Sequence, residues 1–186
     1  MSDRFEFERL AVADVILVKP KVFGDARGFF CETYRKSDFE AAGITEDFVQ
    51  DNHSRSGPRI LRGLHFQLTG QAKLVRASVG RIFDVAVDVR PSSPTFRQWV
   101  GAELSDDNMH QLYVPAGFAH GFVVLGDGAD VTYKVGPTYY QDDTERGIRW
   151  NDPGVGVEWP VADPQTSDRD SAAPTLDEIL DQLSHW

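Results

Sequence analysis

Residues 60–67 read Ile-Leu-Arg-Gly-Leu-His-Phe-Gln, and the interpretation of the whole chain depends on them. They form an apolar, strand-like segment in which Arg62 and His65 stand three residues apart. Histidine titrates near neutral pH and can move a proton, whereas arginine binds a phosphate or carboxylate through two parallel hydrogen bonds. A buried structural histidine beside an ion pair would give the same pattern, so the rest of the sequence must distinguish the two interpretations.

Short β-branched or alternating runs, separated by Gly and Pro turns, lie on both sides of this segment. They predict strands at 12–19, at 96–104, from Tyr113 to near Leu125, at 129–135, and as two consecutive strands within 73–90 that join at Gly80-Arg81. Capping-box patterns predict a short helix from Ser37 to Gly43 and a C-terminal helix from Thr175 to about Leu183. Residues 50–58 are predicted to form a polar loop. Many short strands without a long helical pattern indicate an all-β sandwich or barrel.

Three polar residues fall on apolar faces of three different predicted strands: Lys73, His120 and Tyr133. A single case would carry no weight, and a lysine at a strand end can instead extend its amine to solvent. Three cases, with His65 nearby, indicate that the inner wall of the β-structure is partly polar because it holds a ligand.

Length and composition limit the remaining possibilities. The 186 residues fit a single domain, 1–186, whose C-terminal segment (about 161–186) packs back on the barrel. A net charge of −10 makes nucleic acid and anionic lipid unfavourable partners. Cys31 is the one cysteine in the sequence, and the charged opening residues precede no long apolar run. We therefore expect a cytoplasmic protein with no membrane span.

Several motifs resemble those of the dTDP-4-dehydrorhamnose 3,5-epimerases, in the expected order over about residues 12–180. They are Asp-Ala-Arg-Gly-Phe-Phe (25–30), Arg-Gly-Leu-His (62–65), Lys-Leu-Val (73–75), Ser-Pro-Thr-Phe (93–96), Pro-Ala-Gly-Phe-Ala-His-Gly-Phe (115–122), Trp-Asn-Asp-Pro (150–153), Glu-Trp-Pro (158–160) and Ser-Asp-Arg-Asp (167–170). The resemblance implies an all-β, cupin-type jelly roll with short peripheral helices and a C-terminal helix. It also implies a homodimer that exchanges strands or loops.

The activity implied by the resemblance is epimerisation at C3, C5 or both of a dTDP-linked 4-keto-6-deoxyhexose, without metal or cofactor. His65 would be the base, and Asp170 would orient it. Tyr133 would be the acid, and Lys73 would lie near the keto oxygen. Because removing a proton beside a ketone produces an enolate, a fixed cation at that oxygen is the largest expected contribution, on the order of 3 kcal/mol.

The candidate substrate-binding residues complete the predicted site, some of them contributed across the dimer interface. They are Arg27, Phe30, Glu32, Gln50, Asn52, Arg62, His120, Tyr140 and Arg169. In a straight strand Arg62 and His65 would face opposite ways, and a bulge at Gly63 would bring both to one side. The Tyr133 phenol, with an unperturbed pKa of about 10, is a weak acid without help from its surroundings.

Two other functions fit parts of the sequence. A metal-dependent cupin oxygenase or isomerase would use His120 in its Pro-x-Gly-x-x-His pattern, but His65 lacks a second histidine two residues later. A non-catalytic sugar-nucleotide-binding module would use the same pocket. Binding alone, however, needs no set of acid–base residues such as His65, Tyr133 and Asp170.

Overall fold

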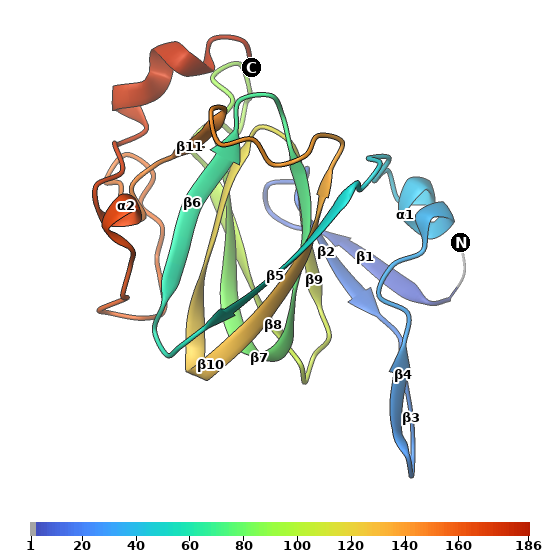
Figure 1. Ribbon diagram of the computed structural model, residues 1–186. Helices are drawn as coiled ribbons and strands as arrows, with labels where there is room; N and C mark the ends of the chain where they lie inside the picture. Colours follow the sequence, from blue (N-terminus) through green and yellow to red (C-terminus); the bar gives the residue numbers. More distant parts are fainter. Residues whose placement is uncertain (1–2) are drawn as a thin grey trace.

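Two long antiparallel strands organise the computed structural model, which describes residues 3–186 (Figure 1). They are β7 (Ala72–Asp88) and β10 (Phe118–Gly136), paired along most of their length. One half of this pair continues into a sheet with β1 (Phe5–Arg9), β2 (Ile16–Pro20), β9 (Gln111–Val114) and β5 (Gln50–Ser56). The other half continues with β8 (Trp99–Ser105), β6 (Leu61–Gln67) and β11 (Glu145–Gly147). The predicted all-β jelly roll is confirmed.

Both long strands bend where they pass from one sheet to the other. Gly80 has a φ of +74°, and a Cβ there would lie 2.2 Å from the Gly128 carbonyl oxygen, so only glycine fits. The expectation of two separate strands joined at Gly80-Arg81 was wrong, because the chain bends there and continues as one strand, β7. The strands predicted before Leu125 and at 129–135 are likewise one strand, β10, with a shift in register between Val124 and Ala129.

Apolar side chains fill the space between the two sheets and also cover the outer face of the second sheet. The inner cluster includes Val75, Ile82, Leu112, Phe118 and Val131. The outer cluster joins the β6 and β7 residues Leu64, Phe66, Val85 and Val87 to Leu176, Ile179 and Leu183 of the C-terminal segment. The strands of this sheet are therefore buried on both faces, and the C-terminal segment holds its position by apolar contact.

The helices within residues 3–186 are α1 (Lys36–Ala41), α2 (Asp168–Ser171) and the 3-10 helix η1 (Asp177–Leu183). Of these, α1 and η1 lie where the sequence predicted helices but differ in detail, whereas α2 was not predicted. The N-cap of α1 is Arg35, with no side-chain cap, so Ser37 does not start it as the capping-box pattern predicted. At the C-terminal helix, Glu178 Oε2 accepts from the Thr175 backbone N–H at 2.7 Å, which is half of a capping box.

Residues 50–56 form a strand, and their prediction as a polar loop was wrong. β5 pairs with β10 from Gln50 opposite Val135 to Ser56 opposite Ala129. It contains no apolar residue, so hydropathy gives no sign of its alternation. Its odd-numbered side chains, Asp51, His53 and Arg55, are exposed, whereas the even-numbered ones are at least half-buried.

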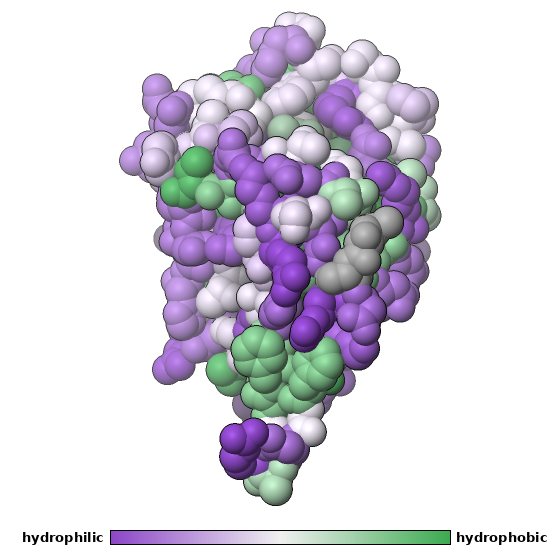
Figure 2. Space-filling model, turned by 90° about the vertical axis from the view of Figure 1, so that its right-hand side faces the viewer, coloured by the Kyte–Doolittle hydropathy of each residue, from purple (hydrophilic) through white to green (hydrophobic). Residues whose placement is uncertain are grey.

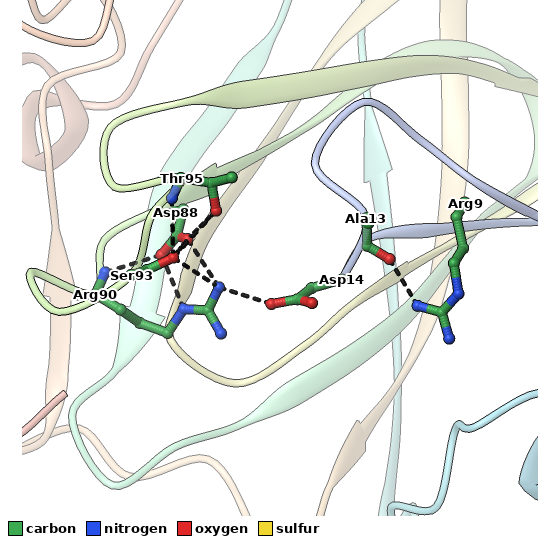
Figure 3. A network of polar contacts seen from close by, with 7 residues as sticks. All are labelled: Arg9, Ala13, Asp14, Asp88, Arg90, Ser93 and Thr95. Carbon is green, nitrogen blue, oxygen red and sulfur yellow. Dashed lines mark hydrogen bonds and ion pairs between the residues drawn. The ribbon is translucent and has the colours of Figure 1, made fainter.

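A buried aspartate fixes the turn that follows β7 (Figure 3). Asp88 is fully buried and accepts hydrogen bonds from Arg90, Ser93 and Thr95 at 2.6–3.0 Å. Arg90 also donates to Asp14 at 2.8 Å, which ties this turn to the segment before β2. Burial alone would raise the pKa of Asp88. The hydrogen bonds lower it by more than burial raises it, so the net shift is downward.

A two-stranded hairpin projects from the body of the protein (Figure 1). It consists of β3 (Val22–Asp25) and β4 (Gly28–Cys31). Its aromatic side chains are exposed, Phe29 by 63% and Phe30 by 61%, and apolar surface gathers at this end of the molecule in Figure 2. Among residues 3–186, no helix is long and apolar enough to cross a membrane.

Candidate active site

A cavity of about 560 Å³ gathers most of the predicted site residues. This volume lies within the usual range for small-molecule sites. The predicted residues that line it are Asn52, Arg62, His65, Lys73, His120, Tyr133, Tyr140, Arg169 and Asp170. They come from β5, β6, β7, β10, the segment after β10 and α2, so the cavity depends on the whole barrel.

A bulge in β6 brings Arg62 and His65 to the same cavity. His65 lies opposite His120 of β10, and Arg62 lies opposite Phe122, so three steps along β6 match two along β10. Gly63 makes this possible: its φ is +123°, and a Cβ there would lie 2.6 Å from the Gly121 Cα. The extra residue corrects the odd spacing that would otherwise separate the two side chains.

His65 is held by a carboxylate from the C-terminal segment. Its Nε2 lies 2.6 Å from Asp170 Oδ1, and Asp170 Oδ2 accepts from the Gly63 backbone N–H at 3.4 Å. Ser167 caps α2 by accepting from the Asp170 backbone N–H at 3.1 Å, which fixes the aspartate in turn. Burial would raise the Asp170 pKa, but the hydrogen bond and charge of His65 lower it on balance. Asp170 therefore stays an acceptor and leaves His65 Nδ1 as the other reactive nitrogen.

Lys73 lies deep in the cavity wall with its ammonium donating to the His65 carbonyl oxygen at 3.2 Å. Burial lowers its pKa to about 8, against the opposing effects of Glu145 and Asp84. The group is still mostly charged at neutral pH. An incompletely solvated ammonium of this kind can stabilise a developing negative charge strongly.

Tyr133 reaches the cavity from β10, where its backbone lies between Asn52 of β5 and Val75 of β7. Burial, and then the negative charge of Glu145, raises the pKa of its phenol. The hydroxyl therefore remains protonated at neutral pH and is available to donate.

Several cavity residues were not predicted. Glu145 of β11 accepts from the Tyr140 hydroxyl at 2.9 Å and pairs with Arg169, which connects two segments at the mouth of the cavity. No periodicity marks its surroundings, so the sequence carried no signal for it. Gln67 could have been predicted from the sequence, because it lies two residues after His65 on the same strand and so shares its face.

Four predicted residues lie outside the cavity. Arg27 and Phe30 are on the exposed hairpin, where Arg27 pairs with Asp25, and Glu32 just beyond it pairs with Arg35. Gln50 lies behind the wall: its Nε2 donates to Asn52 Oδ1 at 2.8 Å, and its Oε1 accepts from the Tyr140 N–H at 3.1 Å. Within residues 3–186, no group of three or more His, Cys, Asp or Glu side chains is arranged to hold a metal ion.

Comparisons of the sequence and of the structure with known proteins all point to one family. The sequence profile of dTDP-4-dehydrorhamnose 3,5-epimerases matches residues 9–178. The chain is 52% identical to such an enzyme from Salmonella typhimurium (strain LT2), over 92% of this chain and 96% of the relative. It is 54% identical to one from Pseudomonas aeruginosa, over 87% and 91%. A crystal structure of a dTDP-6-deoxy-D-glucose-3,5-epimerase from Legionella pneumophila, in complex with dTDP-4-keto-L-rhamnose, superposes with a TM-score of 0.92 at 44% identity, covering 96% of both chains.

Proposed function

The chain belongs to the dTDP-4-dehydrorhamnose 3,5-epimerase family, and we propose that its reaction takes place in the cavity around His65. The enzyme epimerises a dTDP-linked 4-keto-6-deoxyhexose in the biosynthesis of rhamnose-type deoxysugars. One observation carries the assignment of the site: an imidazole oriented by a carboxylate shares a cavity with a buried ammonium. A ring carbon beside a ketone needs this pair of groups to lose a proton.

In the proposed mechanism His65 removes the proton from C3 or C5. Asp170 holds Nε2, so that Nδ1 accepts the proton and the imidazolium is stabilised, as in other His–carboxylate pairs. The electrons of the broken C–H bond move to the C4 oxygen and form an enolate. Lys73 then stabilises this oxygen, and the contribution of one such donor is about 3 kcal/mol.

Inversion requires a proton from the opposite face of the sugar ring. We propose Tyr133 as its donor, because this phenol lines the same cavity from a different strand and keeps its proton at neutral pH. Protonation of the enolate carbon by Tyr133 restores the ketone with inverted configuration. Before the next turnover the phenolate takes up a proton from solvent, and the His65 imidazolium releases to solvent the proton that it removed.

We further propose that the protein is a cytoplasmic homodimer in which the β3–β4 hairpin of a second copy completes the nucleotide end of the cavity. Arg27 and Phe30, two of the predicted substrate-binding residues, lie together on this hairpin and outside the cavity of their own chain. A guanidinium suits a phosphate, and an aromatic ring suits a nucleotide base. The exposed Phe29 and Phe30 would lose their contact with water in such an assembly. A reducing compartment fits a sequence with a single cysteine.

The test of the assigned base is deuterium exchange from solvent into the 4-keto-6-deoxy sugar, followed by NMR at each carbon. His65→Asn should abolish exchange at C3 and C5, because the variant lacks the imidazole that is proposed to remove the proton. Its affinity for dTDP should stay close to that of the wild type, because the nucleotide contacts are intact. Exchange by the variant at the normal rate would mean that His65 is not the base.

A further inference from the structure

A second histidine–aspartate pair lies beside the same cavity, with His120 in its lining. His120 Nε2 lies 2.8 Å from Asp84 Oδ1, and His120 stands directly opposite His65 on the neighbouring strand. Asp84 is fully buried, and its Oδ2 has no hydrogen-bond partner in the part of the chain that the structure describes. A buried carboxylate with an unsatisfied oxygen is unfavourable. This fold therefore retains a residue that stability alone does not explain.

The pairing with Asp84 decides which His120 nitrogen carries the hydrogen. An ionised carboxylate can only accept, so Nε2–H must donate to it. The negative charge of Asp84 acts to raise the pKa of the nearby Lys73, so the two groups interact. Burial lowers the His120 pKa, and the charges of Lys73 and His65 lower it further against the opposing effect of Asp84. The ring is thus neutral, and Nδ1, the nitrogen left for the cavity, presents a lone pair.

We propose that Asp84 is a positioning residue that holds His120 as a hydrogen-bond acceptor, so that His120 binds a hydroxyl of the hexose ring and not the ketone. This inference rests on the proposed function and adds a division of roles to it. Lys73 provides the positive charge at the ketone oxygen, whereas His120 cannot donate there. Both imidazoles are held through Nε2 by a carboxylate, so each leaves Nδ1 for the cavity. They differ in burial, since the side chain of His65 is 25% exposed and that of His120 is 8% exposed. In this division of roles the more accessible His65 moves a proton, and the buried His120 recognises a hydroxyl group.

The first test is the tautomer of His120 in the wild-type enzyme, measured by NMR with ¹⁵N-labelled histidine. The His120→Gln variant identifies the signals, because they disappear from its spectrum. We expect a hydrogen on Nε2 and none on Nδ1 near neutral pH. A hydrogen on Nδ1 in the wild-type protein would overturn the proposal, because that nitrogen could then donate to the ketone.

The second test removes the carboxylate with Asp84→Leu, which has a similar shape. The fixed tautomer should be lost, and the affinity for dTDP-glucose should fall about 2- to 10-fold, the value of one neutral hydrogen bond. The affinity for dTDP, which lacks the hexose, should stay the same. A variant that loses the tautomer but keeps its affinity for dTDP-glucose would refute the role. Equal losses for both ligands would also refute it, since they would indicate a purely structural residue.

Asp88→Asn is the matched control, because Asp88 is equally buried on the same strand and does not line the cavity. This variant should melt at a lower temperature, with kcat/KM measured below that temperature unchanged. These experiments distinguish a failure of the role proposed for Asp84 from a failure of the proposed function. If His65→Asn abolishes exchange while Asp84→Leu binds dTDP-glucose normally, then only the role of Asp84 is wrong.

Discussion

Lys73 must keep its proton to stabilise an enolate, and its burial limits the pH range in which it does so. Burial disfavours the ammonium and lowers its pKa from 10.5 to about 8. Below pH 8 the group is charged and active; above it the neutral amine no longer stabilises the C4 oxygen. We expect kcat/KM, which reports ionisations of the free enzyme, to fall about tenfold per pH unit above pH 8.

Lys73→Arg tests this assignment, because guanidinium stays charged throughout the range. The decline above pH 8 should disappear in this variant, even if its maximal activity is lower. The same decline in Lys73→Arg would show that another group titrates there.

Tyr133 separates proton removal from inversion. In Tyr133→Phe the base is intact, so a proton can leave and return on the His65 side. We expect deuterium to enter the sugar with retained configuration, while inversion slows about 10²- to 10⁴-fold, the usual contribution of a general acid. NMR distinguishes the labelled substrate from the inverted product. Tyr139→Phe, at an exposed tyrosine outside the cavity, should behave as wild type. Inversion at the normal rate in the Tyr133→Phe variant would exclude Tyr133 as the acid.

Some single residues could be predicted from the sequence and others could not, for a physical reason. Lys73 and Tyr133 stand out because each interrupts an apolar strand face. Asp84 also shares a face with Ile82 and Ala86, but the opposite face, with Val85 and Val87, is more apolar, so the sequence does not indicate that the Asp84 face is buried. Both faces are buried, because the C-terminal segment covers the second. A contact between segments so distant in sequence leaves no local signal.

At the scale of the element, the β6 bulge determines whether the site forms. Gly63→Ala would place a Cβ 2.6 Å from the Gly121 Cα and 2.7 Å from the His120 oxygen, at a φ of +123°. The clash and the backbone strain together should destabilise the fold by about 3 kcal/mol. For a chain of this length the melting temperature should fall by about 6–12 °C. Activity should be lost as well, because Arg62 and His65 would no longer face one cavity.

Gly156→Ala provides the control for this prediction. Gly156 also has a positive φ, +69°, but nothing lies within 4 Å of the added Cβ. Backbone strain without a clash should cost about 1 kcal/mol. Equal losses of stability in the two variants would mean that the contact with β10 does not matter.

β5 shows the limit of hydropathy as a guide to strands. One of its faces contributes Asn52 and Ser54 to the cavity, and the other meets solvent, so both faces are polar. The alternation that defines an amphipathic strand is absent, and composition alone indicates a loop. The bulge at Gly63 could be inferred because two residues needed to face one site. For residues 50–56, no pair of site residues had to share a face, so the sequence offered no comparable reason to predict a strand.

At the scale of the whole molecule, motifs spread along the sequence predicted the architecture. They did not predict how far apart the motifs lie in the folded chain. Arg27 and Phe30 belong to the predicted site, yet they lie on a hairpin that projects away from the body (Figure 1). Sequence specifies neither how far a hairpin extends nor which copy of the chain it contacts. The proposed dimer explains this separation, and it can be tested without a structure of the assembly.

Two inactive variants should restore activity to each other if the hairpin acts across the dimer. In the proposed dimer, Arg27→Ala would weaken the contact of the hairpin with phosphate, and His65→Asn would remove the base. In a mixed dimer, the subunit that keeps His65 receives the intact hairpin of its partner, so one of its two sites is complete. Random pairing of equal amounts makes about half of the dimers mixed, which restores about a quarter of wild-type activity after co-refolding. If each hairpin served its own chain, no site would contain both residues, and the mixture would be no more active than its components.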